Sequence, residues 1–167
     1  TAPATSRITY WFPAKGNRPE VKVVWRDGAV YPPRPPELAD DAVWPPDAGG
    51  GQLWIGSAGK LVAGTYADDP TLLDAAKMAD IKAHAVPQKY PRSAGVYAEW
   101  IAAAKGGPPA GSAFDRYSGA FTEMVLLGCL AVRMGKTLEV DPATGAVKNV
   151  TVPQEYIQPS YRAGWSL

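Results

Sequence analysis

The sequence predicts an α+β fold of two layers, in which helices pack on one face of a large, mostly antiparallel open sheet. Three observations support this prediction. The expected strands come in hairpins, they outnumber the helices, and most of them precede the helices instead of alternating with them one by one. The length of 167 residues suits a domain with its own core, so residues 1–167 are expected to form a single domain.

Two strands with one wetter side are expected near the start of the sequence, at residues 7–13 and 20–28. Apolar residues alternate along both, and they form one side of the expected sheet: Ile8, Tyr10, Phe12, Val21, Val23 and Trp25. The link between the two strands contains proline and glycine, as hairpin loops do. Trp11 and Val24 lie on the opposite side, where apolar residues favour a partner that covers the sheet.

Residues 28–51 form a proline-rich excursion. Four prolines between Pro32 and Pro36 force an extended, polyproline-like path that cannot enter the interior of a sheet. One interpretation of this composition is a surface excursion or a disordered linker. Tyr31 and Trp44 favour the other interpretation, a segment that lies on a partner subunit or another domain.

A second hairpin is expected over residues 52–66, with its turn at Gly56–Gly59. This glycine-rich turn lacks the full P-loop spacing and leads into a strand, so it does not predict a phosphate site. Two helices are expected to follow, at residues 71–85 and 93–107. Ser93 is the expected N-cap of the second of them.

A third helix is expected at residues 120–134. Its apolar run is shorter than the roughly 20 residues that span a bilayer, so it is interpreted as a core helix and not as a membrane anchor. Gly128 would let another backbone approach closely, and Gly135 is well placed to end the helix as a left-handed cap. A strand and an edge segment are expected at residues 137–150, and the aromatic tail at residues 153–167 is expected to dock on the body of the domain.

Charge and motifs argue against several classes of function. The net charge of +1, without a basic block, gives no reason to expect binding to nucleic acid or to an anionic membrane. The single cysteine, Cys129, and the single histidine, His84, argue against a metal site of the Cys/His type. Neither residue stands in a pattern for nucleophilic catalysis. The sequence therefore predicts no catalytic residue and no metal ligand.

Four residues near helix starts are predicted to line the substrate side: Arg92, Tyr97, Tyr117 and Glu123. The first two flank the start of the second expected helix, and the other two flank the start of the third. Free backbone N–H groups at helix starts suit polar ligands. In the alternative interpretation the tyrosines belong to the core, Arg92 pairs with a carboxylate, and Glu123 stabilises the dipole of the third helix.

Four segments of the chain together resemble one protein family in their order and spacing: residues 9–38, 51–66, 90–150 and 156–165. The last of these contains Tyr-Arg-Ala-Gly-Trp, which is similar to the Tyr-Arg-x-Gly-Trp endings of a bacterial branch of that family. The chain thus resembles, over nearly its whole length, the C-terminal domain of the Gfo/Idh/MocA oxidoreductases, named for glucose-fructose oxidoreductase and inositol dehydrogenase.

The resemblance implies a sheet domain that helps to form the substrate pocket and oligomerises through its exposed sheet face. It also implies an N-terminal Rossmann domain that binds NAD or NADP, so this chain alone is expected to bind neither cofactor and to turn over nothing. The loops before the helices would lie toward the cofactor cleft. One departure is Val96-Tyr97, where members of the branch often carry histidines, which implies a different substrate or the loss of part of the site.

The leading hypothesis for function is therefore the substrate-side and oligomerisation domain of an NAD(P)-dependent oxidoreductase that acts on a sugar or polyol-like alcohol. Relatives that use the same cofactor transiently for hydrolysis leave net redox chemistry open. The alternative is a non-catalytic interaction domain, whose aromatic sheet face and proline-rich segment bind another chain. The sequence favours neither a cytoplasmic nor an exported location.

Overall fold

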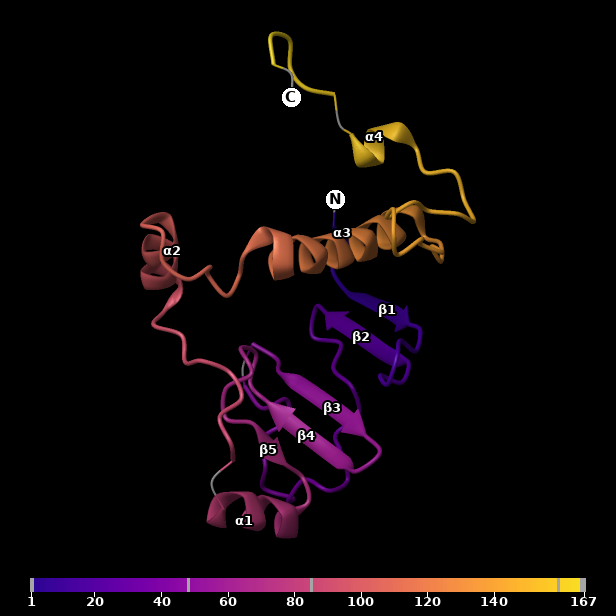
Figure 1. Cartoon of the computed structure of the whole chain (residues 1–167). Coiled ribbons are helices and arrows are strands. Elements are labelled where there is room, and N and C mark those ends of the chain that lie inside the picture. Colours follow the sequence, from indigo (N-terminus) through magenta and orange to yellow (C-terminus); the bar gives the residue numbers. More distant parts are fainter. Residues whose placement is uncertain (1, 48, 85, 159, 166–167) are drawn as a thin grey trace. The chain divides into compact units, whose positions relative to one another are not determined.

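The computed structural model describes residues 2–47, 49–84, 86–158 and 160–165 (Figure 1). Strands and helices are both present and the strands pair in small antiparallel sheets, so the predicted α+β class is confirmed. The chain divides into two compact units, where the sequence suggests one domain. The first unit comprises Thr1–Arg7 and Trp25–Ser93, and the second comprises Ile8–Val24 and Ala94–Leu167.

The single large sheet predicted from the sequence is wrong. The described strands form a two-stranded sheet, β1-β2, and a three-stranded sheet, β3-β4-β5. The proline-rich excursion separates the two sheets along the chain, and prolines cannot donate the hydrogen bonds that a continuous sheet would need. Farther along, Val140 and Val147 make only an isolated antiparallel bridge where a strand and an edge segment are predicted.

The first unit is built on a hairpin of β3 (Gln52–Gly56) and β4 (Gly59–Ala63), as predicted. The short strand β5 (Thr71–Leu72) pairs with the other edge of β4. As the central strand, β4 carries Val62 and Ala63, which are the buried hydrophobic residues of the described chain.

Helix α1 (Ala75–Ala83) follows β5 in the first unit. The Asp74 side chain caps it by accepting a hydrogen bond from the backbone N–H of Lys77. His84 is exposed at the C-cap, where its Nδ1 lies 3.0 Å from the Asp80 carboxylate. A helix is therefore present where the sequence predicts one, but it is shorter than the predicted range of 71–85, because Thr71 and Leu72 pair with β4 as strand β5.

In the described part of the proline-rich excursion, residues 28–47 and 49–51, side chains donate hydrogen bonds to the backbone of the segment itself. The Arg34 guanidinium donates hydrogen bonds to the carbonyls of Leu38, Ala39 and Ala42. The Trp44 indole N–H donates to the Pro32 carbonyl at 3.0 Å. The carbonyl groups of this segment have no partner in a sheet, because its prolines prevent it from pairing as a strand. The side chains of the segment supply hydrogen bonds to some of these carbonyls instead.

The β1-β2 hairpin contains β1 (Ser6–Phe12) and β2 (Val21–Asp27). Along β1 the half-buried and exposed residues alternate without a break, which confirms the predicted inward side of this strand. On the other side Trp11 is 63% exposed, and the Lys22 ammonium lies 4.7 Å above its ring. Along β2, by contrast, Val21, Val23 and Trp25 are exposed as well.

The second unit is organised by helix α3 (Gly119–Met134), so a helix is present where the sequence predicts one. The interpretation of this helix as a buried core helix is wrong, because apolar side chains such as Phe121 and Leu126 are exposed. Gly128 is its one buried residue and lies against Tyr10 and Ile8 of β1. The close approach predicted at this glycine is thus real, although side chains and not a second backbone make the contact. Gly135 ends the helix with φ of 62°, the predicted left-handed cap.

Three short helical segments complete the second unit: α2 (Val96–Ala104), the π-helical turn η1 (Phe114–Ser118) and α4 (Gln154–Ile157). The residue at the N-cap of α2 is Gly95, so the prediction of Ser93 as the cap is wrong. Two residues separate Ser93 from the first helical turn, because Gly95 has a φ of 103° and turns the chain into the helix. No helix of the described chain is long and apolar enough to cross a membrane.

The tail predicted to dock is described at residues 153–158 and 160–165, whereas residues 159 and 166–167 lie outside the described part. The Tyr156 ring lies 3.9 Å from the Arg133 guanidinium of α3, so the first part of the tail does contact the body. Farther along, the Arg162 guanidinium lies 4.4 Å from the Trp165 ring. Trp165 itself remains 64% exposed, so its contact is local.

Candidate functional site

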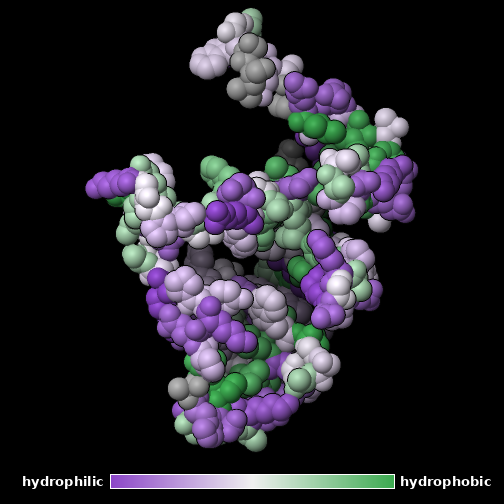
Figure 2. Space-filling model, viewed as in Figure 1, coloured by the Kyte–Doolittle hydropathy of each residue, from purple (hydrophilic) through white to green (hydrophobic). Residues whose placement is uncertain are grey.

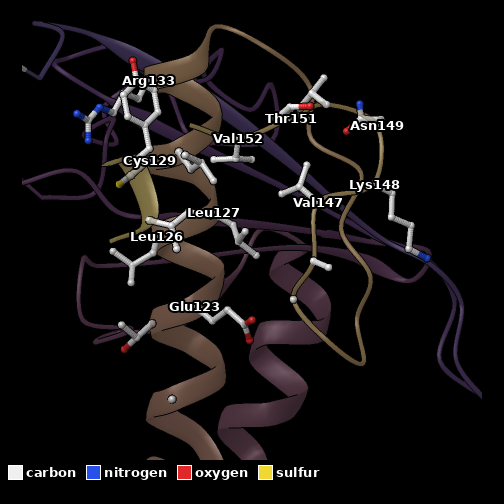
Figure 3. Close-up of a pocket in the computed structure, with 18 of the residues that line it drawn as sticks. Glu123, Leu126, Leu127, Cys129, Arg133, Val147, Lys148, Asn149, Thr151 and Val152 are labelled. Atoms are coloured by element: carbon white, nitrogen blue, oxygen red, sulfur yellow. The ribbon is translucent and has the colours of Figure 1, made fainter. Parts of the chain in front are cut away.

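A hollow with a volume of about 1320 Å³ lies in the second unit. One wall is a face of α3 and the other is the segment 145–152 (Figure 3). Tyr156 and Ile157 of α4 also line the hollow. Its size is that of a pocket for a drug-sized or larger ligand. Because every lining residue belongs to one unit, the hollow is defined without reference to the other.

The α3 wall is apolar in the middle and charged at both ends. Leu126, Leu127 and Leu130 line the middle, with Glu123 toward the helix start and Arg133 toward its end. Ten residues of helix separate the two charges, which corresponds to about 15 Å at a rise of about 1.5 Å per residue. An elongated ligand could thus contact a carboxylate, an apolar surface and a guanidinium in turn.

Side-chain hydrogen bonds fix the opposite wall. The Asn149 amide donates to the Thr137 carbonyl at 3.0 Å, and its oxygen accepts from the Glu139 N–H at 2.9 Å. The Lys148 ammonium lies 2.9 Å from the Asp141 carboxylate. The hydrogen bond from Lys148 is the main reason that the pKa of the Asp141 carboxyl lies below its usual range, with the Ala143 N–H contributing further.

Glu123 is a carboxylate in the lining of the hollow that is available to bind a ligand. Its Oε1 lies 2.5 Å from the position that a Cβ at residue 145 would occupy, and Gly145 has a φ of 69°. A larger residue at position 145 would therefore displace the carboxylate. Within the described residues, Glu123 has neither a hydrogen bond nor an ion pair, so both of its oxygens can accept from a ligand.

The Arg133 side chain is contacted on one face of its guanidinium by the ring of Tyr156. Its guanidinium stacks on the Tyr156 ring, and it meets no hydrogen-bond acceptor in the described part of the chain. A stacked guanidinium keeps its N–H groups free at the edges, where a carboxylate or a phosphate oxygen could bind. The contact with Tyr156 joins segments that are far apart in the sequence, so no local sequence pattern predicts it.

The predicted site residues do not come together in this hollow. Glu123 lines it, and Tyr117 does not, although its neighbour Ser118 does. Tyr117 instead stacks on Phe121, with ring centroids 5.8 Å apart. Tyr97, in the first turn of α2, is 78% exposed and does not line the hollow either.

Arg92 belongs to the first unit, where it is exposed, and so it is not part of the hollow. Tyr97 and Tyr117 are also more than half exposed, so the alternative interpretation of these tyrosines as core residues is wrong. Each lies on a short helical segment that is too small to enclose an aromatic ring.

Cys129 lies in an apolar stretch of the sequence, yet the residue is exposed and lines the hollow. It also lies close to Tyr10, whose hydroxyl pKa is raised mainly by burial and further by the neighbouring thiol. Helical periodicity shows which residues share a face of α3, but not whether another element covers that face.

The arrangement is suited to binding, and no set of residues in it forms a complete catalytic centre. Within the described residues, no group of three or more His, Cys, Asp or Glu side chains could hold a metal ion. The hollow offers a free carboxylate, a stacked guanidinium and an apolar surface between them. Comparisons of the sequence with protein-family models and with curated proteins find no match.

Proposed function

We propose that this chain is the substrate-side and oligomerisation domain of an NAD(P)-dependent oxidoreductase that acts on a sugar or polyol-like alcohol. The proposal joins the sequence resemblance described above to one structural observation, the extent of uncovered apolar surface. In this role the chain holds part of the substrate and another polypeptide domain supplies the nucleotide site.

The uncovered apolar surface is the observation that carries the proposal. Val62 and Ala63 are the only buried hydrophobic residues of the described chain, whereas large apolar side chains are exposed in both units. Examples are Trp11, Trp54, Tyr66, Trp100 and Phe114. Figure 2 shows hydrophobic residues at the surface of the face viewed. Exposed apolar surface on this scale is typical of a domain that functions against other protein surfaces.

The hollow beside α3 supports a role in ligand binding. A free carboxylate such as that of Glu123 can accept hydrogen bonds from two neighbouring hydroxyl groups of a polyol. Within the described residues, no glycine-rich loop leads from a strand into a helix, and the glycine turn of the first unit joins β3 to β4. We therefore expect the isolated chain to bind no NAD or NADP.

Kinetics of the gene product that contains this chain, together with a nucleotide-binding domain, would test the proposal. Arg92→Ala and Tyr97→Phe should each lower kcat/KM by on the order of tenfold or more, about the loss of one hydrogen bond to a polar or charged group. Tyr66→Phe, at a residue that is 92% exposed and outside the predicted site, is the matched control. Unchanged kinetics in both site variants, with intact folding, would refute the assignment of Arg92 and Tyr97.

The same apolar surface also supports a second candidate, a non-catalytic interaction domain. In that case the exposed face with Trp11 would bind another chain, and no alcohol would be oxidised. Calorimetry with NAD and NADP on the gene product separates the two candidates. Micromolar binding that requires a domain outside this chain supports the oxidoreductase, and no binding supports the interaction domain.

A further inference from the structure

Strand β3 lies at the edge of its sheet, and nothing in the described part of the chain pairs with its outer side. The strand order is β3-β4-β5, so β3 has β4 on one side only. The backbone hydrogen bonds outside the regular elements include none from residues 52–56. An edge strand of this kind presents a row of free N–H and C=O groups that only another extended strand can satisfy together.

The sequence of β3 lacks the features that usually protect an edge strand. It reads Gln-Leu-Trp-Ile-Gly, without proline, lysine or any other charge. Trp54 is 61% exposed and Ile55 is 72% exposed, so the edge is apolar on its surface as well. Natural sheets that stay unpaired at the edge carry charges, prolines or bulges there. Because β3 has no charge and no proline, we expect its outer edge to be paired with another strand in the functional protein.

The register of the hairpin determines which backbone groups of β3 are free. A two-residue turn joins Gly56 to Gly59, and these residues face each other across the ladder. The pair that closes such a turn is hydrogen-bonded, and hydrogen-bonded pairs recur at every second residue. Gly56, Trp54 and Gln52 therefore point their backbone groups toward β4. Leu53 and Ile55 point theirs toward the free edge.

These free groups are symmetric about Trp54, which is what pairing with an identical strand requires. If two copies of β3 run antiparallel with Trp54 opposite Trp54, Leu53 of each copy faces Ile55 of the other, and all four residues exchange hydrogen bonds. Trp54 then occupies a non-hydrogen-bonded pair, where Cα atoms are about 4.5 Å apart and cross-strand aromatic pairs are favourable. The contact is the same on both copies, as a two-fold dimer needs.

We propose that β3 pairs with β3 of a second copy of this chain, antiparallel and centred on Trp54. The two three-stranded sheets then become one continuous six-stranded sheet. This contact goes beyond the proposed function, because it uses a strand edge and neither the exposed face with Trp11 nor the hollow beside α3.

A single cysteine at position 54 tests the pairing directly. Trp54→Cys should form a disulfide-linked dimer under mild oxidation, since non-hydrogen-bonded pairs bring the two Cβ atoms within disulfide range. The native Cys129 is replaced by serine in all variants, so that it cannot contribute a crosslink. Tyr66→Cys, at a position that is 92% exposed and outside the strand, is the matched control. Non-reducing electrophoresis should show the dimer for position 54 and at least tenfold less for position 66.

Association of the reduced chain supplies a second readout. Ile55→Lys places a charge on the free edge and should weaken dimerisation at least tenfold in analytical ultracentrifugation, while Tyr66→Lys should leave it unchanged. If position 54 crosslinks no better than position 66, or Ile55→Lys dimerises like the unmodified chain, the pairing is wrong. If Trp11→Asp alone abolishes association, the interface is the β1-β2 face. That outcome overturns the β3 pairing and leaves the proposed function intact.

Discussion

Gly128 shows how a single residue sets the distance between a helix and a sheet. A Cβ at this position would lie 1.9 Å from the Tyr10 hydroxyl oxygen and 3.3 Å from a methyl group of Ile8. A separation of 1.9 Å between a carbon and an oxygen that are not bonded is too short, so either the helix or the Tyr10 side chain would have to move. The glycine therefore allows α3 to lie on β1, and this contact positions the wall of the hollow that carries Glu123.

We expect Gly128→Ala to destabilise the chain by roughly 1–3 kcal/mol, the usual cost of overpacking. Tyr10→Phe removes the oxygen that the new methyl group would meet first, so the double variant should recover part of the loss. Urea unfolding of the two single variants and the double variant measures this coupling. Additive effects of the two substitutions would contradict a direct clash between residues 10 and 128.

At the scale of elements, Asp47 fastens the end of the proline-rich excursion to the chain that leaves β4. Its carboxylate accepts hydrogen bonds from the Thr65 N–H at 2.7 Å, the Thr65 hydroxyl at 2.8 Å and the Gly49 N–H at 2.8 Å. These bonds favour the ionised form, and the pKa of the Asp47 carboxyl is lowered, chiefly by the Thr65 N–H and then by the Thr65 hydroxyl.

These hydrogen bonds of Asp47 should make the stability of the first unit decrease at acid pH. A lowered pKa in the folded state means that the stabilisation is complete above the ordinary aspartate pKa of about 4 and is lost as the pH falls through the lowered value. Thermal unfolding between pH 6 and pH 2 should therefore show a steeper loss for the unmodified chain than for Asp47→Asn. The variant should be less stable at pH 6, and equal slopes for the two proteins would contradict the role of Asp47.

Arg34 and Trp44 act on the same excursion from within. Both donate to backbone carbonyls of the segment itself, which leaves the segment independent of a strand partner. Trp44 donates to a proline carbonyl in the way that aromatic grooves of other proteins recognise polyproline segments. Within the described residues, side chains of the excursion thus satisfy several of its own carbonyls, whereas the outer edge of β3 has no strand partner.

At the scale of the whole molecule, the small enclosed core means that the isolated chain should associate with itself. Trp11 on β1 is 63% exposed and Val24 on β2 is 37% exposed, so the hairpin offers an apolar face to water. Trp11→Asp should reduce the mass measured by light scattering at high concentration without abolishing association, because a charge buried in an interface is unfavourable and the edge of β3 is unchanged. Val43→Asp, which removes exposed apolar surface outside the hairpin, is the control. A monomer at all concentrations would contradict this prediction.

Local patterns in the sequence were enough to predict most of the elements. The alternation along β1, the turn between β3 and β4 and the left-handed cap at Gly135 each depend on residues within a few positions of one another. Backbone sterics and side-chain periodicity act over that range, so a single sequence contains the information. The α+β class followed from the order of these elements.

The sequence by itself determined less about the candidate site than about the elements. Glu123 was predicted as a site residue, but its position beside Gly145 depends on a contact between segments 22 positions apart in the numbering. The stacking of Arg133 on Tyr156 also joins segments that are distant in the sequence. The placement of Arg92 in the first unit likewise depends on which distant segments pack together. Tertiary structure alone decided them, because which distant segments meet depends on packing across the fold and not on local spacing.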